Sequence, residues 1–285
     1  MTVSIPPLPG IILDPIVRLA LEEDLGRAGD LTSDATIPAG TQMGAVIAAR
    51  KAGVIGGLDA AEHALRLIDS DVRFTPKKTD GTEVAPGDVI ARLEGSARSI
   101  LIAERTMLNF LGRLSGVASL TRQYVNAVAH TKARIVCTRK TTPGHRALEK
   151  RAVRCGGGTS HRYGLDDAIL IKDNHIAACN GSVAEAIERA KAYAGHLRMV
   201  EVEVDTLAQL EIALAHAPQA ILLDNMSLED LRIAAKMTGG RVILEASGSV
   251  TLFSVAAIAE TGVDFISSGA LTHSAPSLDV GLDVV

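Results

Sequence analysis

The sequence predicts an α/β protein in which a small α/β domain, residues 1–115, precedes a larger domain built on a parallel sheet, residues 116–271. From residue 133 onward, short apolar runs typical of strands buried on both faces alternate with stretches of helical periodicity. The runs are Ala133–Cys137, Ala168–Ile171, Met199–Val204, Ala220–Leu223, Val242–Leu244 and Val263–Ile266. Because a helix separates successive strands, we expect a parallel sheet, either open or closed as a barrel.

The first domain has a different pattern. A capped amphipathic helix over residues 14–23 leads into a loop-rich stretch, and residues 41–67 indicate a strand, a glycine turn and a helix. Glycine and proline punctuate short alternating strands over residues 81–101, which is typical of an antiparallel layer. A long helical run, residues 103–131, then leads to the first parallel strand.

The helices between the parallel strands carry their own start and stop signals. Ser182 with Glu185 and Thr206 with Gln209 form capping boxes at two helix starts. Gly195 and the Gly239–Gly240 pair mark helix ends.

Composition excludes several classes of protein. A hydrophobic fraction of 47% with 22% charged residues is ample for a packed core, so disorder is excluded. Aromatic residues make up only 2% of the chain, which leaves few platforms for stacking nucleic-acid bases. A net charge of −4 gives no general attraction to nucleic acid or to an anionic membrane. We therefore expect neither nucleic acid nor membrane as a partner.

The beginning of the chain contains four prolines and no apolar run of secretory length, so no targeting or membrane segment is expected. Three cysteines without a CxxC spacing suit a reducing compartment. These features predict a cytoplasmic protein.

Polar or ionisable residues follow all six apolar runs, where parallel α/β proteins bind ligands. These residues are Thr138–Lys140, Lys172–His175, Glu201 and Glu203, Asp224 and Asn225, Glu245–Ser249, and Ser267–Ala270. We expect a ligand site where these strand ends meet. Asp173, Asn174 and His175 are candidates for supporting Lys172, without individual roles.

Basic residues gather at the first strand ends. The set is Arg139, Lys140, His161, Arg162 and Lys172. Between Arg134 and Lys172 there are nine Lys and Arg against three Asp and Glu, a local charge of +6. Such a patch suits a ligand with several carboxylates or phosphates. Four basic residues of the intervening segment are expected in a solvated loop instead: Arg146, Lys150, Arg151 and Arg154. The Gly156–Gly158 run is a candidate for a loop that closes on a ligand.

The later strand ends are acidic and then small. Glu201, Glu203 and Asp224 could hold Mg²⁺ or sugar hydroxyls, or could form ion pairs with the basic set. Ser247–Ser249 and Ser268–Ala270 place backbone N–H groups near tight turns, which suits phosphate. No catalytic triad, Walker or Rossmann motif is present. We expect chemistry by positioning and electrostatics.

The motifs resemble the quinolinate phosphoribosyltransferase family, which is also called nicotinate-nucleotide pyrophosphorylase (carboxylating). The resemblance covers nearly the whole chain. The matching segments are EEDLGRAGDLTSDATIP (22–38), ERTMLNFLGRLSGVASLT (104–121), TRKTTPGHRALEKRAVRCGGGTSHRYGL (138–165), IKDNH (171–175), EVEVD (201–205), LDNM (223–226), EASGSV (245–250) and SSGALTHS (267–274).

The resemblance implies an N-terminal α/β sandwich, an incomplete α/β barrel of the type II phosphoribosyltransferase kind, and a tail, residues 272–285, that returns to the first domain. It implies a pentosyltransferase of de novo NAD biosynthesis. In that reaction quinolinate and phosphoribosyl pyrophosphate (PRPP), with Mg²⁺, give nicotinate mononucleotide, pyrophosphate and CO₂. It also implies a homodimer, with assembly beyond the dimer left open.

The resemblance further implies roles for individual residues. Arg139, His161, Arg162 and Lys172 would bind quinolinate, with Arg105 reaching in from the partner subunit. Thr138, Lys140, Lys172, Glu201 and Asp224 would meet PRPP, and the last two would also meet the metal. Phosphate would lie on Ser247, Gly248, Ser249, Ser268, Gly269 and Ala270. The residues expected to carry the chemistry are Lys140, Lys172, Glu201 and Asp224.

Three other functions fit parts of the pattern. One is a related phosphoribosyltransferase acting on nicotinate or another ring acid. Another is a lyase or aldolase that forms a Schiff base at Lys172. The third is a phosphate-sensing binding protein without catalytic activity.

Overall fold

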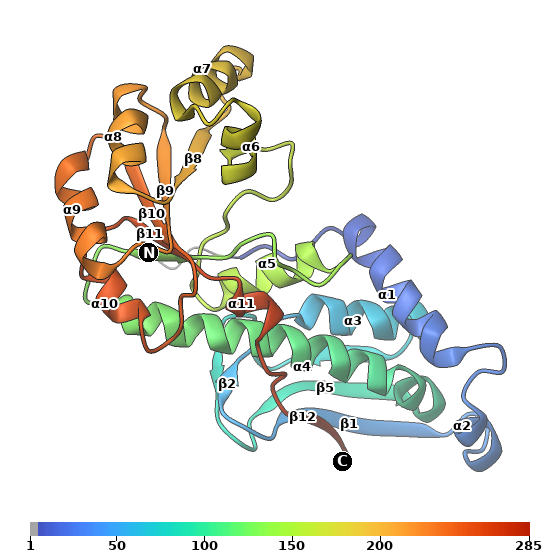
Figure 1. Ribbon diagram of the computed structural model, residues 1–285. Coiled ribbons are helices and arrows are strands. Elements are labelled where there is room, and N and C mark those ends of the chain that lie inside the picture. Colours follow the sequence, from blue (N-terminus) through green and yellow to red (C-terminus); the bar gives the residue numbers. More distant parts are fainter. Residues whose placement is uncertain (1–4) are drawn as a thin grey trace. The chain divides into compact units, whose positions relative to one another are not determined.

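The computed structural model describes residues 5–285, so residues 1–4 of the predicted first domain lie outside the described residues. The described chain forms two compact units (Figure 1). The first unit contains the residues up to Arg122 together with Thr141–Gly157 and Thr272–Val285, and the second contains Gln123–Lys140 and Gly158–Leu271. This division differs from the predicted boundary near residue 115, because residues 141–157 belong to the first unit although they lie between two parallel strands in sequence.

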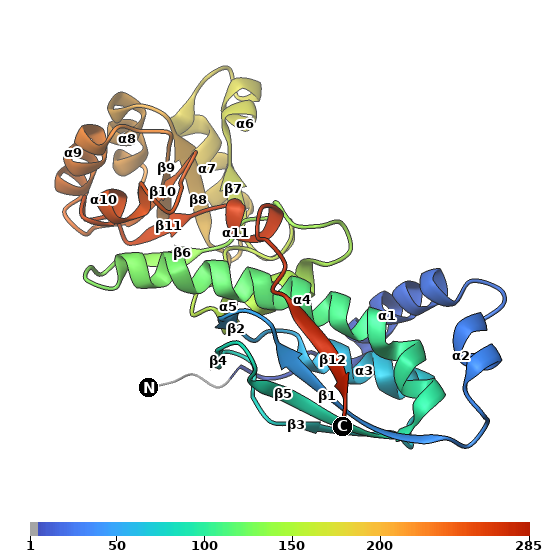
Figure 2. The ribbon, with the colours of Figure 1, turned by 90° about the horizontal axis from the view of Figure 1, so that it is seen from below.

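An antiparallel sheet in the order β12-β1-β5-β3 forms one layer of the first unit. Its strands are β1 (Gln42–Ala49), β3 (Arg73–Pro76), β5 (Val89–Ser96) and β12 (Val280–Val284), and β2 (Gly53–Val54) and β4 (Glu83–Val84) form a separate short pair. β12 pairs with β1, with Ala45 opposite Val284 and Ala49 opposite Val280 (Figure 2). The C-terminal tail is therefore an edge strand of the first unit.

Helices supply the rest of the first unit: α1 (Gly10–Leu25), α2 (Leu31–Thr36), α3 (Leu58–Ile68), α5 (Arg146–Cys155) and most of α4 (Ala97–Val128). α3 buries small side chains, Ala60, Ala61 and Ala64, which allow close packing. α1 begins at Gly10, a turn before the predicted start, so Pro15 lies inside the helix, where it removes one backbone hydrogen bond.

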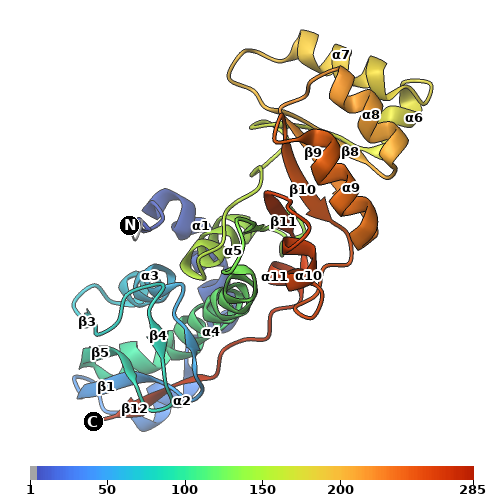
Figure 3. The same ribbon diagram turned by 90° about the vertical axis from the view of Figure 1, so that its left-hand side faces the viewer.

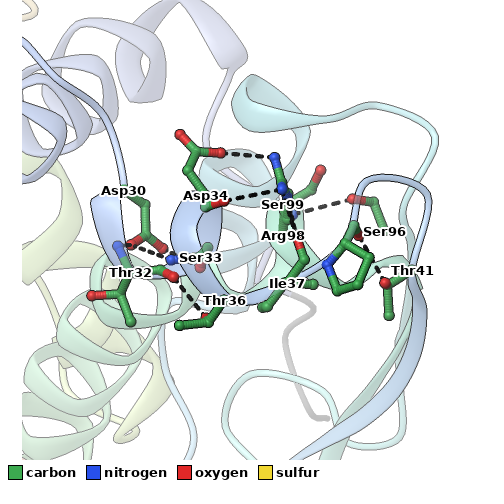
Figure 4. A network of polar contacts seen from close by, with 11 residues as sticks. Asp30, Thr32, Ser33, Asp34, Thr36, Ile37, Thr41, Ser96, Arg98 and Ser99 are labelled. Carbon is green, nitrogen blue, oxygen red and sulfur yellow. Dashed lines mark hydrogen bonds and ion pairs between the residues drawn. The ribbon is translucent and has the colours of Figure 1, made fainter.

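The loop-rich stretch after α1 contains α2, which apolar periodicity does not predict. Asp30 caps this short helix by accepting hydrogen bonds from the N–H groups of Thr32 and Ser33, both at 3.0 Å. Arg98, near the start of α4, donates to the Asp34 carboxylate at 2.9 Å and to the Ile37 carbonyl at 2.8 Å (Figure 4). Polar contacts with a distant part of the chain position α2, which is why local sequence patterning misses it.

The prediction of a solvated loop for Arg146, Lys150, Arg151 and Arg154 is wrong, because all four lie on the helix α5 and two of them are nearly buried. Lys150 is only 3% exposed on α5. Arg151 forms ion pairs with Asp80 and Asp59, and all three side chains are nearly buried. Burial acts against the charge of Arg151, but the two carboxylates outweigh it and raise the pKa of its guanidinium. The charged face of α5 packs in the first unit because it finds partners there, which its polarity alone does not reveal.

A six-stranded parallel sheet forms the core of the second unit, in the order β6-β11-β10-β9-β8-β7. Its strands are β6 (Arg134–Val136), β7 (Ile169–Ile171), β8 (Val200–Val204), β9 (Ala220–Asp224), β10 (Ile243–Ser247) and β11 (Phe265–Ser267). All six predicted strands are thus confirmed. β6 and β7 are the two ends of the sheet order, so the architecture is that of an incomplete barrel.

The helices of the second unit are α6 (Asp173–Ala178), α7 (Val183–Tyr193), α8 (Leu207–Ala215), α9 (Leu228–Thr238) and α10 (Val255–Ala259), and α11 (Ala270–His273) follows the last strand. α7, α8 and α9 lie side by side along the strands (Figures 1 and 3). Ser182 and Thr206 cap their helices as predicted, and Gly239 ends α9 at φ 56°. None of the helices among the described residues is long and apolar enough to cross a membrane.

Candidate active site

Three glutamate side chains project from one face of the parallel sheet. Glu203 on β8 and Glu245 on β10 both have Leu222 of β9 as their register partner, and Glu201 lies two residues before Glu203. Register partners and residues two apart share a face. All three glutamates are at most 9% exposed. The sheet therefore gathers three nearly buried carboxyl groups on one side, a costly arrangement without compensating partners.

His161 compensates part of this acidic charge. Its Nε2 atom lies 3.0 Å from Glu201 Oε2 and 3.7 Å from Glu245 Oε2. The other ring nitrogen, Nδ1, accepts a hydrogen bond from the Arg162 N–H at 2.8 Å. With Nδ1 accepting, Nε2 is the nitrogen that donates to the glutamates. Potential ligand atoms of His161, Glu201 and Glu245 all lie within 4.8 Å of one another.

Glu245 has the most perturbed carboxyl group of this cluster. Burial raises its pKa to about 7, the negative charge of Glu201 adds to this rise, and His161 opposes it. One of its oxygens, Oε1, is buried without a hydrogen-bond partner. At neutral pH, Glu245 is therefore balanced between its protonated and ionised forms.

Stability should depend on pH through Glu245. Its carboxyl group titrates near 4.5 in the unfolded chain and near 7 in the folded one, so the folded state binds the extra proton between these values. Stability is then expected to fall as pH rises from about 4.5 to about 7, by roughly 3 kcal/mol. Glu245→Gln should remove this decline. Urea unfolding at several pH values, in buffer with a chelator and no substrate, checks the prediction, and equal pH slopes for both proteins would contradict it.

Lys172 and Glu203 form an ion pair at the ends of β7 and β8. Lys172 is also the N-cap residue of α6, where its N–H donates to His175 Nδ1 at 2.9 Å and the His175 N–H donates to the Lys172 carbonyl at 2.8 Å. This reciprocal cap assigns His175 a role that the sequence left open: it fixes the backbone that carries Lys172.

Arg139 and Arg162 carry like charges close together. Burial lowers the pKa of the Arg162 guanidinium, and repulsion from Arg139 lowers it further. Arg162 donates from Nη1 to the Ala168 carbonyl at 3.1 Å, while its Nε is buried without a hydrogen-bond partner. Two guanidinium groups that repel each other, with a buried Arg162 donor still unused, favour a ligand that has more than one negative group.

Lys140 follows Arg139 and is exposed. Its N–H donates to Thr138 Oγ1 at 3.0 Å, so the Thr138 side chain shapes the turn at the end of β6. The sequence-predicted residues Thr138, Arg139, Lys140, His161, Arg162 and Lys172 all belong to the second unit.

The loop after β10 requires glycine at position 248. Gly248 has φ +92°, and a Cβ atom there would meet the Asn225 side-chain oxygen and lie 2.8 Å from the Asn225 backbone nitrogen. Ser249 also has a positive φ, 49°, and the Asn225 N–H donates to the Ser247 carbonyl at 3.0 Å. Backbone N–H groups in a tight turn of this kind can form an anion-binding concavity.

Gly248→Ala should destabilise the protein more than Gly240→Ala. Gly240 also has a positive φ, +75°, but nothing lies within 4 Å of a Cβ built on it. Both changes incur backbone strain, of about 1 kcal/mol, and only Gly248→Ala adds a steric clash, expected to cost at least about 1 kcal/mol more. Thermal unfolding of both variants measures the difference. Equal losses of stability in the two variants would show that the close approach of Gly248 to Asn225 does not contribute to the cost of the substitution.

The second predicted phosphate loop is only partly suited to that role. The Ser268 N–H donates to the Val136 carbonyl at 3.1 Å and its hydroxyl donates to the Val250 carbonyl at 3.3 Å. Both groups are therefore already in use. Gly269 and Ala270 follow at the start of α11. At the end of β9, two strands away in the sheet order, the Asp224 carboxylate accepts from Asn225 Nδ2 at 2.8 Å.

Arg105 is exposed on α4 in the first unit, as its place in the predicted first domain requires, and its contribution to a partner's site stays a prediction. Glu245 is the residue that the sequence-based picture of the site left incomplete. Glu245 is named among the strand ends but given no role, although it lies against His161 and close to Glu201. The available signal was that Glu245 interrupts an apolar strand, as Glu201 and Glu203 do.

An incomplete parallel barrel with paired arginines, a lysine and a carboxylate cluster at its strand ends defines an enzyme-like site for a small polyanionic ligand. Comparison with known proteins agrees. The N-terminal domain of quinolinate phosphoribosyl transferase matches residues 30–115, and its C-terminal domain matches residues 117–283. The chain belongs to the quinolinate phosphoribosyltransferase family.

Individual relatives are similar over nearly their whole length. The chain is 45% identical over 262 residues to the probable nicotinate-nucleotide pyrophosphorylase (carboxylating) of Bacillus subtilis, covering 92% of this chain and 90% of the relative. It is 45% identical over 273 residues to the corresponding Mycobacterium leprae protein, covering 94% and 95%. The nicotinate-nucleotide pyrophosphorylase structure from Francisella tularensis superimposes with a TM-score of 0.93 at 40% identity, over 100% of both chains.

Proposed function

We propose that this chain transfers the phosphoribosyl group of PRPP to quinolinate and releases CO₂ and pyrophosphate, which makes nicotinate mononucleotide for NAD biosynthesis. Membership of the family supports the reaction class. The structural observation that carries the substrate assignment is that the charges of Arg139 and Arg162 repel each other, since two such cationic groups suit a dicarboxylate.

Quinolinate would bind at the basic end of the site. Arg139 and Arg162 would each face a carboxylate, with His161 and Lys172 completing the positive surroundings. Arg162 has a buried Nε without a hydrogen-bond partner, which a carboxylate oxygen could satisfy. With aromatic residues at only 2% of the chain, recognition of the pyridine ring would rest on its carboxylates.

PRPP would bind across the neighbouring strand ends. Lys140 and Lys172 would face its phosphates, with Thr138 shaping the turn that carries Lys140. The phosphate on its sugar would lie on the loops of Ser247–Ser249 and Ser268–Ala270, with the Gly248 loop as the stronger candidate because the Ser268 N–H and hydroxyl are already hydrogen-bonded. Glu201 and Asp224 would accept hydrogen bonds from the ribose hydroxyls.

Mg²⁺ would be held by the same two carboxylates, directly or through water or PRPP. Asp224 is half-buried and accepts one side-chain hydrogen bond, which leaves lone pairs for a cation, and carboxylate oxygens are the donors that Mg²⁺ prefers. When bound, the ion would neutralise charge on the pyrophosphate group.

The side chains would act by charge rather than as nucleophiles. When the bond from the ribose anomeric carbon to pyrophosphate breaks, the electron pair leaves with pyrophosphate and the ribose gains oxocarbenium character. Glu201 and Asp224 would stabilise that positive charge, while Lys140 and Lys172 stabilise the leaving group. The pyridine nitrogen lone pair then forms the new bond to the anomeric carbon. The resulting pyridinium accepts the electron pair of the adjacent C–COO⁻ bond as CO₂ departs, and that carbon then takes up a proton.

A substrate panel tests the proposal against its nearest alternative. Purified protein is incubated with PRPP, Mg²⁺ and one ring acid at a time: quinolinate, nicotinate or another pyridine carboxylate. Chromatography should detect nicotinate mononucleotide with quinolinate and little nucleotide with the monocarboxylates. A preference for nicotinate would contradict the proposal and favour the related transferase.

We also propose a homodimer in which Arg105 of one subunit completes the site of the other. Arg105 is exposed on α4 and is therefore available to a partner. For location we propose the cytoplasm, since the sequence has three cysteines without spacing typical of disulfide frameworks.

A further inference from the structure

Arg113 and Glu149 form an ion pair within the first unit. Arg113 on α4 donates from Nη2 to Glu149 Oε1 at 2.8 Å and from Nε to the same oxygen at 3.3 Å. The Glu149 side chain, on α5, is 0% exposed. Removing one partner from such a buried pair leaves an uncompensated charge, which is strongly destabilising. The positions of these two side chains are therefore strongly constrained within the unit.

Glu149 also forms hydrogen bonds with Thr142, in the segment that follows Thr138–Lys140 in the chain. It accepts hydrogen bonds from the Thr142 N–H at 3.1 Å, through Oε2, and from the Thr142 hydroxyl at 2.8 Å, through Oε1. Thr142 is exposed and outside any helix, and it lies two residues after Lys140 in the chain. One buried carboxylate thus fixes the backbone that continues directly from Arg139 and Lys140.

Arg113 holds a second segment on its other side. Its Nη1 donates to the Ala275 carbonyl at 2.8 Å, and its Nη2 also donates to the Thr272 carbonyl. Both acceptors are buried residues that follow Ala270, the last residue of the second candidate phosphate loop. The planar guanidinium can serve these acceptors together because its five donors point in fixed directions.

We propose that Arg113 and Glu149 are positioning residues that fix the chain segments continuing directly from the two substrate loops, Glu149 through Thr142 and Arg113 through Thr272 and Ala275. This rests on the proposed function, because it assigns the loops Thr138–Lys140 and Ser268–Ala270 to substrates. Neither residue of the pair touches substrate. Loss of the Glu149 charge would weaken its hydrogen bonds to Thr142 and also leave the guanidinium without the partner that orients it, so the segments that continue from both loops would lose their anchor.

Glu149→Gln tests the proposal, with Asp80→Asn as the matched control. Asp80 is the partner of Arg151 in the other nearly buried ion pair of α5, and it contacts neither loop. Both changes remove one buried charge and should lower the melting temperature. Only Glu149→Gln should lower kcat/KM, roughly 10- to 100-fold, and raise KM for both quinolinate and PRPP. Asp80→Asn should leave both KM values within about 3-fold of the wild type.

Thr142→Val supplies a second variant that keeps both charges. Thr142 is exposed, so this protein should fold normally, lose one bond to Glu149 and show a smaller change in the same direction. Wild-type constants in Glu149→Gln, or the same kinetic loss in Asp80→Asn, would overturn the proposal. Should Glu149→Gln fail to fold, unchanged constants in Thr142→Val overturn it instead.

A binding measurement separates this inference from the proposed function. Calorimetric titration with inorganic pyrophosphate needs no turnover, and Glu149→Gln should bind it at least about 5-fold more weakly than the wild type does. Absence of turnover in the wild type would contradict the proposed function. Equal pyrophosphate binding by the wild type and Glu149→Gln would contradict the role of the pair.

Discussion

Arg162→Ala is expected to weaken quinolinate binding by at least about 30-fold while PRPP binding changes by less than about 3-fold. Removing one partner of a buried, hydrogen-bonded charge pair costs about 2 kcal/mol or more. Arg162 is half-buried beside Arg139 and has a buried Nε available for a carboxylate. Calorimetric titration of each ligand separately measures the two affinities.

Arg154→Ala is the control for a general charge effect. Arg154 is exposed on α5, and its replacement removes the same unit of charge from a position outside the predicted ligand contacts. The Arg154→Ala protein should bind quinolinate with an affinity close to that of the wild type. Equal weakening of quinolinate and PRPP by Arg162→Ala would count against a carboxylate-binding role for this arginine.

Lys172→Met is expected to reduce kcat by roughly 100- to 1,000-fold, because Lys172 would supply positive charge between the two substrates as pyrophosphate leaves. The change also leaves Glu203, its ion-pair partner, nearly buried without that charge. The double variant Lys172→Met with Glu203→Gln removes this stability cost and should remain equally slow. Single-turnover kinetics with a parallel melting curve separates the loss of catalysis from the loss of folding.

Two further measurements on Lys172 distinguish the competing accounts. Borohydride treatment with a carbonyl substrate should trap no adduct on the wild type, whereas a trapped adduct at Lys172 would support the Schiff-base lyase.

Mixing Lys172→Met subunits with Arg105→Ala subunits should regenerate some activity, since a mixed dimer contains one site with both residues intact. Failure to regenerate any activity, with subunit exchange verified, would contradict the proposed contribution of Arg105 across subunits.

The sequence predicted the parallel sheet well because burial on both faces leaves a direct record in apolar runs. Polar residues follow or interrupt each run, so the candidates among them, including Arg139, Lys172 and Glu201, could be identified without coordinates. The short helix α2 could not, because a capping aspartate and the contacts of Arg98 hold it rather than an apolar stripe. The local pattern of apolar residues indicates which segments are buried, but it does not predict polar contacts between segments that are distant in sequence.

Because local sequence patterns do not reveal contacts between distant segments, the environments of several charged residues were not predicted. Glu149, Lys150 and Arg151 look like a charged, solvated stretch, yet all three are buried or partly buried on α5. Their partners, including Arg113 and Asp80, lie far away in sequence. Glu245 carried a usable signal as a charge inside a strand, but its pKa of about 7 depends on burial and on Glu201, which only the folded arrangement brings close.

Release of CO₂ from carboxyl-labelled quinolinate tests the central claim most directly. Purified protein is supplied with quinolinate alone, with quinolinate and PRPP, and with quinolinate, PRPP and Mg²⁺. The account predicts CO₂ release only when PRPP and Mg²⁺ are both present, with one pyrophosphate and one nicotinate mononucleotide formed for each CO₂. Release of CO₂ without PRPP, or formation of a nucleotide that retains both carboxylates, would contradict it.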